Sequence, residues 1–244
     1  MENKKIKVKF ILVGNGKVGK TSLINQYLDK TFTENYLMTM GSDKTIKKIN
    51  IEGKEVSLEI CDTAGQIDYR AINKIFMKNT DIALIVYDIT NRKSFEELTN
   101  WINSVKESNI KKNGDKEINN NQNVIFGIAA NKSDLYEQKV INKKEGEEFA
   151  KNNKALFFET SAKDYDSVEN VFIKLTEEYL KKEEERKKKE EEERKKKEEE
   201  ERKKEEERKK EEEKKKEEEK KRELELIQKK IDDNNDCSSK CSIM

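Results

Sequence analysis

The segment from Lys181 to Glu223 constrains the fold of this chain more than any other feature, because every residue in it is Lys, Arg or Glu. A stretch without apolar side chains cannot contribute to a hydrophobic core, so the core must be built from the residues before it. About 175 residues of ordinary globular composition are long enough for one domain with a full core. We therefore expect a globular domain at residues 1–180, a charged segment at 181–231 and a flexible tail at 232–244.

The charges of the chain are balanced, with 53 Lys and Arg against 52 Asp and Glu. They are interleaved at short range, so no large field of one sign would attract nucleic acid, and we expect no such partner. The three cysteines, Cys61, Cys237 and Cys241, form no disulfide framework and fit a reducing cytosol. Residues 1–9 lack the apolar core of a signal peptide, and no apolar run approaches about 20 residues. Membrane contact would therefore need an attached lipid.

Hydrophobic patterning over residues 1–180 alternates between strand and helix periods. We expect strands at Ile6–Val13, Ile46–Ile51, Val56–Ile60, Ile82–Tyr87, Val124–Ala130 and Leu156–Phe158. Helices are expected at Lys20–Leu28, along the face of Phe95, Leu98, Ile102 and Val105, around Phe149, and at Val168–Leu175. This order predicts an α/β fold, with a mostly parallel sheet flanked by helices. The Asn-rich run between Ile110 and Val124 shows no periodicity and is interpreted as a flexible surface insertion.

A phosphate-binding motif stands directly between the first expected strand and the first expected helix. Residues 14–21 read GNGKVGKT, which matches G-x-x-x-x-G-K-[ST] in the context that the motif requires. The glycines let backbone N–H groups surround phosphates, Lys20 can contact the β and γ oxygens, and Thr21 can offer its hydroxyl to Mg²⁺. The predicted nucleotide-binding residues here are Gly14, Asn15, Gly16, Lys17, Val18, Gly19, Lys20, Thr21 and Ser22.

A second motif, Asp62-Thr63-Ala64-Gly65-Gln66, follows the third expected strand. The Asp62 carboxylate can hold Mg²⁺ through water, and the Gly65 N–H can meet the γ-phosphate. Gln66 can orient an attacking water, which makes it the candidate catalytic residue.

Two further segments indicate which base is bound. Asn131-Lys132-Ser133-Asp134 follows an apolar strand, and Asp134 there can accept hydrogen bonds from both N1–H and N2–H₂ of guanine. Ser161-Ala162-Lys163 follows the next strand and would present a backbone N–H to guanine O6. Adenine lacks this pair of donors, so the sequence predicts GTP as the ligand.

Together these motifs resemble the Ras superfamily of small G proteins over about Lys5 to Leu180. The resemblance implies a P-loop NTPase G domain that binds GTP or GDP with Mg²⁺ and slowly hydrolyses GTP. It also identifies Thr39 as the switch threonine that senses Mg²⁺ and the γ-phosphate, Phe32 as the aromatic against guanine, and Tyr36 as the aromatic that closes over the phosphates. The implied partners are an exchange factor, a GTPase-activating protein and effectors.

Within the superfamily, three segments look most similar to Rab proteins, the vesicle-trafficking branch: Tyr36–Gly41, Tyr87–Thr90 and Ser94–Phe95. Rab proteins usually carry Phe, Trp and Tyr at the positions of Lys44, Cys61 and Phe76, which form part of the effector surface, and Ile67 replaces the usual glutamate.

Two alternatives to a trafficking switch stay open at this stage. One is a Ras-type signalling switch, and the other is a largely non-catalytic, GTP-bound scaffold that acts through the charged segment. Gln66 and Gly16 favour hydrolysis, because one can position water and the other leaves room for an inserted arginine.

The charged segment places Glu184 near Lys188, Glu192 near Lys196 and Glu199 near Lys203 at i,i+4 spacing, which favours a helix. A lone helix from Lys181 to Glu223 would be about 65 Å long. A coiled coil would have to start from the short apolar patch of Leu224, Leu226, Ile227 and Ile231. A disordered spacer is the third possibility.

The sequence ends in Cys241-Ser242-Ile243-Met244, a C-a-a-X box that predicts farnesylation of Cys241. Cys237 is a candidate for a second, palmitoyl chain or is an idle thiol, since one lipid anchors only marginally. We therefore expect a lipid-anchored protein on the cytoplasmic face of a membrane, with a cytosolic pool.

Overall fold

The computed structural model describes residues 6–33, 42–63, 75–113, 116–119 and 124–240. Its framework is a six-stranded sheet with the order β2-β3-β1-β4-β7-β8. The strands are β1 (Ile6–Val13), β2 (Ser42–Ile51), β3 (Lys54–Thr63), β4 (Ile82–Asp88), β7 (Ile125–Asn131) and β8 (Leu156–Glu159). Only β2 runs antiparallel to its neighbour, so the carboxyl ends of the other five strands meet at one edge.

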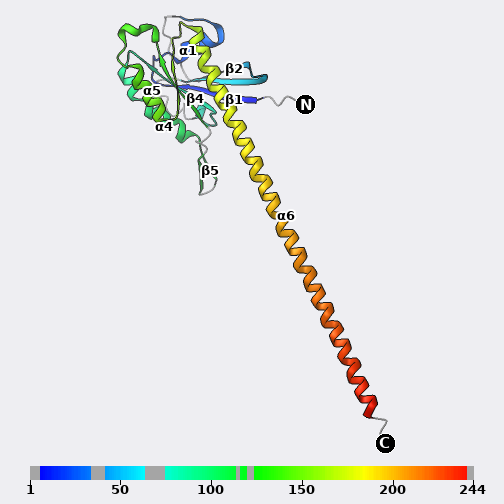
Figure 1. Ribbon diagram of the computed structural model, residues 1–244. Coiled ribbons are helices and arrows are strands. Elements are labelled where there is room, and N and C mark those ends of the chain that lie inside the picture. Colours follow the sequence, from blue (N-terminus) through cyan, green and yellow to red (C-terminus); the bar gives the residue numbers. More distant parts are fainter. Residues whose placement is uncertain (1–5, 34–41, 64–74, 114–115, 120–123, 241–244) are drawn as a thin grey trace. The chain divides into compact units, whose positions relative to one another are not determined.

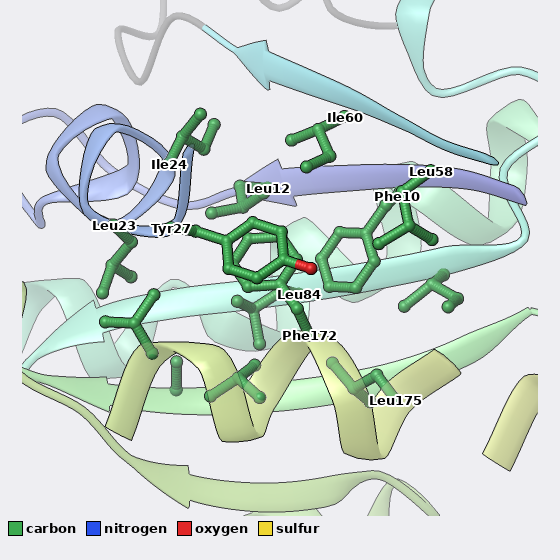
Figure 2. Packing of buried hydrophobic residues seen from close by; sticks show 14 of the residues in the cluster. Phe10, Leu12, Leu23, Ile24, Tyr27, Leu58, Ile60, Leu84, Phe172 and Leu175 are labelled. Carbon is green, nitrogen blue, oxygen red and sulfur yellow. The ribbon is translucent and has the colours of Figure 1, made fainter. Parts of the chain in front are cut away.

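Helices cover both faces of this sheet (Figure 1). The first face packs against α1 (Lys20–Asp29) and the first turns of α6 (Tyr165–Lys240). There the ring of Phe172 stacks on Tyr27 at 3.8 Å and on Phe10 at 4.6 Å between centroids (Figure 2). The second face packs against α3 (Arg92–Glu96), α4 (Leu98–Ser108) and α5 (Lys143–Asn152).

The sequence of β1 is a nearly continuous apolar run because the strand is buried on both faces. Phe10 and Leu12 point into the core of the first face, whereas Ile11 and Val13 point into the core of the second. A strand buried on both faces needs apolar residues at successive positions, as is typical of the parallel sheets in α/β proteins.

The expected strands and helices are confirmed, with two refinements. The predicted helix along Phe95 to Val105 is divided at Glu97 into α3 and α4, and a short 3₁₀ helix, η3 (Ser133–Gln138), follows β7. The hairpin between β2 and β3 turns at Glu52 and Gly53, whose φ angles are 50° and 78°. Two positive φ values match the turn type that suits the twist of a two-residue hairpin.

The run after Ile110, which the sequence predicts as a flexible surface insertion, contains regular structure in its first part. Strands β5 (Ile110–Asn113) and β6 (Lys116–Asn119) form a separate two-stranded antiparallel sheet. Backbone hydrogen bonds hold such a ladder without apolar periodicity, so the hydrophobic pattern of the sequence does not predict it. The Gly114-Asp115 dipeptide between the paired residues Asn113 and Lys116 was the available signal in the sequence, because two strands separated by Gly-Asp are typical of a hairpin.

The chain divides into two compact units, residues 1–184 and 185–244. Within the second unit α6 is a continuous helix with exposed ion pairs at i,i+4, among them the expected Glu199–Lys203 pair at 2.8 Å. In the first unit Glu184 contacts Lys54 of β3.

None of the helices that the structure describes has an apolar stretch long enough to span a bilayer.

Helix α6 continues to Lys240, which differs from the flexible tail expected from Asp232 onward. No Gly or Pro occurs after Leu180, so no strong helix breaker opposes propagation of a helix that has already formed.

Candidate functional site

The loop between β1 and α1 is closely packed around its glycines. Gly14 and Gly19 have φ angles of 147° and 98°, and residues other than glycine rarely adopt such positive values. A Cβ atom on Gly14 would lie 2.2 Å from the Val86 carbonyl oxygen, and one on Gly19 would lie 2.3 Å from Asn131 Nδ2. Glycine at these two positions therefore allows the loop to pack closely against Val86 of β4 and Asn131 of β7.

Lys20, at the start of α1, carries a buried ammonium group. Its Nζ donates hydrogen bonds to the carbonyl oxygens of Gly14 at 2.9 Å and Asn15 at 3.0 Å. Loss of hydration lowers the pKa of Lys20 to about 8, and the nearby Asp62 carboxylate opposes this shift only in part. A phosphate group would supply the negative charge that this buried cation lacks.

Thr21 and Asp62 come together from α1 and the carboxyl end of β3. The Thr21 hydroxyl donates to Asp62 Oδ2 at 2.6 Å, and Asp62 is buried. Hydroxyl and carboxylate oxygens are ligands that suit Mg²⁺ next to a bound phosphate chain. The residues present thus fit the expected ion, whereas Thr39 lies outside the described part of the chain.

Asn131 connects the phosphate-binding loop to the loop after β8. Its Nδ2 donates to the Val18 carbonyl at 2.7 Å, and its Oδ1 accepts from the Thr160 hydroxyl at 3.2 Å. All three residues are buried, so this contact fixes two loops that lie far apart in sequence.

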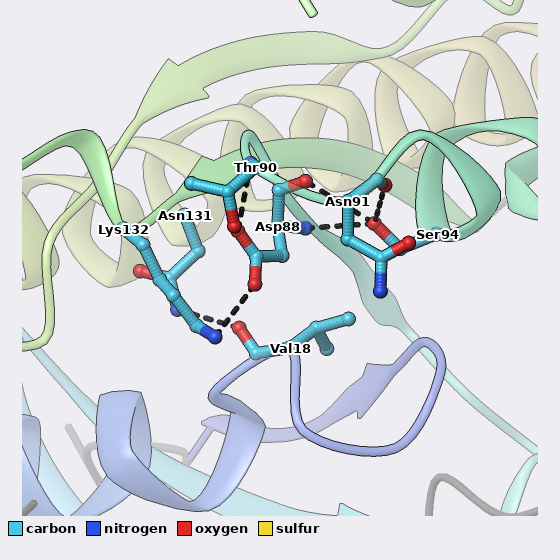
Figure 3. A network of polar contacts seen from close by, with 7 residues as sticks. All are labelled: Val18, Asp88, Thr90, Asn91, Ser94, Asn131 and Lys132. Atoms are coloured by element: carbon cyan, nitrogen blue, oxygen red, sulfur yellow. Dashed lines mark hydrogen bonds and ion pairs between the residues drawn. The ribbon is translucent and has the colours of Figure 1, made fainter. Parts of the chain in front are cut away.

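Lys132 reaches the end of the neighbouring strand. Its Nζ forms an ion pair with Asp88 Oδ2 at 2.6 Å (Figure 3). The other oxygen of Asp88 accepts from the backbone N–H and the hydroxyl of Thr90, at 2.8 and 2.7 Å. Lys132 has a left-handed backbone conformation, with φ at 62°, at the point where the chain leaves β7.

The expected guanine-binding residues converge at the same edge of the sheet. Asp134 Oδ1 accepts from the Ser161 hydroxyl at 2.7 Å, and Asp134 Oδ2 lies 3.6 Å from Lys163 Nζ. That ammonium group is 5.4 Å from the centroid of the Phe32 ring, while Ala162 between the two polar residues is buried. The two loops and Phe32 thus adjoin one another.

Several predicted site residues lie beyond the part of the chain that the structure describes. Tyr36, Thr39, Gly65, Gln66 and Cys241 lie outside the described residues, and Cys237 belongs to α6 at a position where side chains are not described. The effector positions are partly described: Lys44 is exposed, Cys61 is buried and Phe76 is half-buried.

Two residues at the site were missed from sequence. Asp88 had a usable signal, because it ends a buried parallel strand at the edge that also carries Asp62 and Asn131. Trp101, whose indole N–H donates to Asn15 Oδ1 at 2.7 Å, had none, since it comes from a helix distant in sequence.

A glycine loop before a helix, a carboxylate at the end of the next parallel strand and polar loops after two further strands define the class of this protein, a P-loop NTPase G domain. Residues 9–181 match the model of the Ras family. Over 174 residues the chain is 38% identical to Ras-related protein Rab-2B of Dictyostelium discoideum, covering 71% of this chain and 81% of that protein. The chain belongs to the Ras family and is Rab-like. Small GTPases of this family generally bind guanine nucleotides with Mg²⁺ and hydrolyse GTP.

Proposed function

We propose that this protein is a GTP-binding molecular switch that slowly hydrolyses GTP and acts in vesicle or membrane trafficking. The observation that carries the proposal is the position of Asn131, which links the backbone of the phosphate-binding loop to the loops that carry Asp134 and Ser161. A ligand that spans these loops must have both phosphates and a base with donors for Asp134. GTP and GDP meet both requirements.

In this proposal each group has a separate role. Lys20, which donates to the Gly14 and Asn15 carbonyls, also donates to phosphate oxygens, whose negative charge relieves the cost of its burial. Asp134 accepts from the guanine N–H groups, the backbone N–H of Ala162 or Lys163 meets O6, and Phe32 packs against the base. Thr21, Thr39 and Asp62 would hold Mg²⁺, and the ion would supply positive charge next to the phosphates. Gln66 orients the attacking water.

Guanine recognition is tested by Asp134→Asn. Hydrogen bonds to a charged acceptor contribute about 1.5–3 kcal/mol each, so losing the match to two donors should weaken GTP binding by about 100-fold or more. Affinity should shift toward xanthine nucleotides, measured by competition against a fluorescent guanine nucleotide. Glu137→Gln removes an exposed carboxylate three positions along and is the matched control, with no expected change. Equal competition by ATP would contradict the assignment.

Hydrolysis is tested by single-turnover assays on wild type and Gln66→Leu, with and without a candidate activating protein. The substitution should abolish stimulated hydrolysis while GTP affinity stays unchanged, because the glutamine orients water and contributes little to ground-state binding. Thr21→Asn should disturb Mg²⁺ ligation and favour the GDP-bound or empty form. If wild type does not hydrolyse bound GTP at all, the scaffold alternative holds.

The trafficking role draws on the similarity to Ras-related protein Rab-2B, whose name places it among Rab proteins. A Ras-type signalling role is the second candidate, since Lys44, Cys61 and Phe76 depart from the aromatic residues that Rab proteins usually carry at these effector positions. Prenylation of Cys241, in a chain that terminates at Met244, would attach the protein to the cytoplasmic face of a membrane, with the charged helix as a spacer.

A further inference from the structure

Trp101 is the one tryptophan of the chain, and it is tied to the phosphate-binding loop. The residue lies in α4, and only 4% of it is exposed. Its indole Nε1–H donates to the side chain of Asn15 at 2.7 Å across 86 positions of sequence. A buried indole usually needs a partner for this N–H, and here the partner belongs to the phosphate-binding loop.

The helix that carries Trp101 is held firmly. Leu98, Ile102 and Val105 are buried against the second face of the sheet. At the end of α4, Asn109 Nδ2 donates to the Met77 carbonyl at 2.8 Å, and Asn109 Oδ1 accepts from the Thr80 N–H at 2.9 Å. The position of the indole N–H is therefore set by the core, and the loop is fastened to it.

Asn15 passes this restraint on to Lys20. While its side chain is held by Trp101, its backbone carbonyl accepts from Lys20 Nζ at 3.0 Å. Without the indole contact, one of the restraints on Asn15 and on the peptide groups next to it would be lost. Those groups belong to the backbone that should surround the phosphates.

We propose that Trp101 is a positioning residue that holds the phosphate-binding loop in its binding conformation through Asn15, and that its indole N–H reports nucleotide binding. The inference rests on the proposed nucleotide binding. A loop that is ordered before its ligand arrives loses less conformational entropy on binding, so the contact should slow nucleotide release.

The contact itself is tested without nucleotide. A full-length ¹⁵N-labelled chain has a single indole N–H resonance, because it has a single tryptophan. Asn15→Leu removes the acceptor and should move this resonance, whereas Asn103→Leu, an exposed residue on the same helix, should not. Addition of GDP, and then of a non-hydrolysable GTP analogue, should move the wild-type resonance and move it less in Asn15→Leu.

The consequence for binding is tested by release of a fluorescent GDP analogue from wild type, Asn15→Leu, Trp101→Phe and the double variant. Loss of one neutral hydrogen bond should speed release about 3- to 10-fold in each single variant. The double variant should be no faster than either single variant, because both remove the same contact. Asn103→Leu should release at the wild-type rate.

The outcomes separate this inference from the proposed function. A wild type that fails to bind the analogue would defeat the proposed function, while the nucleotide-free resonance still decides the contact. A wild type that binds, together with unchanged release from Asn15→Leu or an unmoved indole resonance, would overturn the inference alone. If Trp101→Phe does not fold, the Asn15→Leu comparison decides by itself.

Discussion

Lys20 is a cation that the fold keeps away from water before any phosphate is present. Its pKa is lowered from 10.5 to about 8, chiefly by burial. Below pH 8 the group is charged in both the folded and the unfolded protein, so its burial destabilises the fold fully there. As the pH rises from about 8 toward 10.5, the folded state loses its proton first and this cost is relieved.

The pH dependence of stability follows with a defined sign. Between pH 8 and 9.5 the free energy of unfolding of nucleotide-free wild type should rise by about 1–2 kcal/mol relative to Lys20→Met, at about 1.4 kcal/mol per pH unit. Urea unfolding of both proteins across this range measures the difference. Parallel pH profiles would show that Lys20 titrates normally.

The glycines of the chain allow steric and conformational costs to be separated. Gly14 and Gly53 both have positive φ, but nothing lies within 4 Å of a Cβ on Gly53, whereas one on Gly14 would meet the Val86 carbonyl. Gly53→Ala should cost only backbone strain, about 1 kcal/mol. Gly14→Ala should cost about 3 kcal/mol or more, because strain and overpacking add. Similar unfolding midpoints for the two variants would contradict the packing at Gly14.

At the scale of elements, the strands and helices of the domain were predictable because apolar periodicity directly reflects which face is buried. The β5–β6 hairpin has no such periodicity, since its ladder depends on backbone pairing, and only its turn residues give a signal in the sequence. The charged part of α6 is a different case: pairs such as Glu191–Lys195 at 2.7 Å and Glu200–Lys204 at 2.9 Å join exposed neighbours on one helix. Such a helix needs no tertiary partner.

A peptide covering residues 181–231 should therefore be helical by circular dichroism at low concentration. Its melting should not depend on concentration, as it would for a coiled-coil dimer. High salt should weaken the helix only in part, because the helix propensity of Glu, Lys and Arg remains when charges are screened. A permuted peptide of equal composition with like charges at i,i+4 is the control and should be less helical. A random-coil spectrum for the native order would leave a flexible tether.

At the scale of the whole molecule, the proposed trafficking role combines a nucleotide switch with attachment to a membrane. A farnesyl chain contributes only about 0.8 kcal/mol per buried CH₂, so a single chain binds reversibly. Cys241→Ser should release the full chain to the cytosol, and Cys237→Ser should have a smaller effect that appears only if this thiol is acylated. Fractionation of cells that express each variant measures both. Retention of Cys241→Ser on membranes would show that the anchor lies elsewhere.

The sequence by itself determined the class of fold, the place of the glycine loop between a strand and a helix, and the i,i+4 charge pattern of the charged segment. Each of these features depends on patterns within short segments of the sequence, so local geometry and side-chain chemistry are enough to predict it. Only the tertiary structure decided which other distant residues meet, including Asn131 with Val18, Asp88 with Lys132 and Trp101 with Asn15. Such contacts depend on strand order and on how helices pack across a sheet. These are properties of the whole core, and the pattern of a single segment does not contain them.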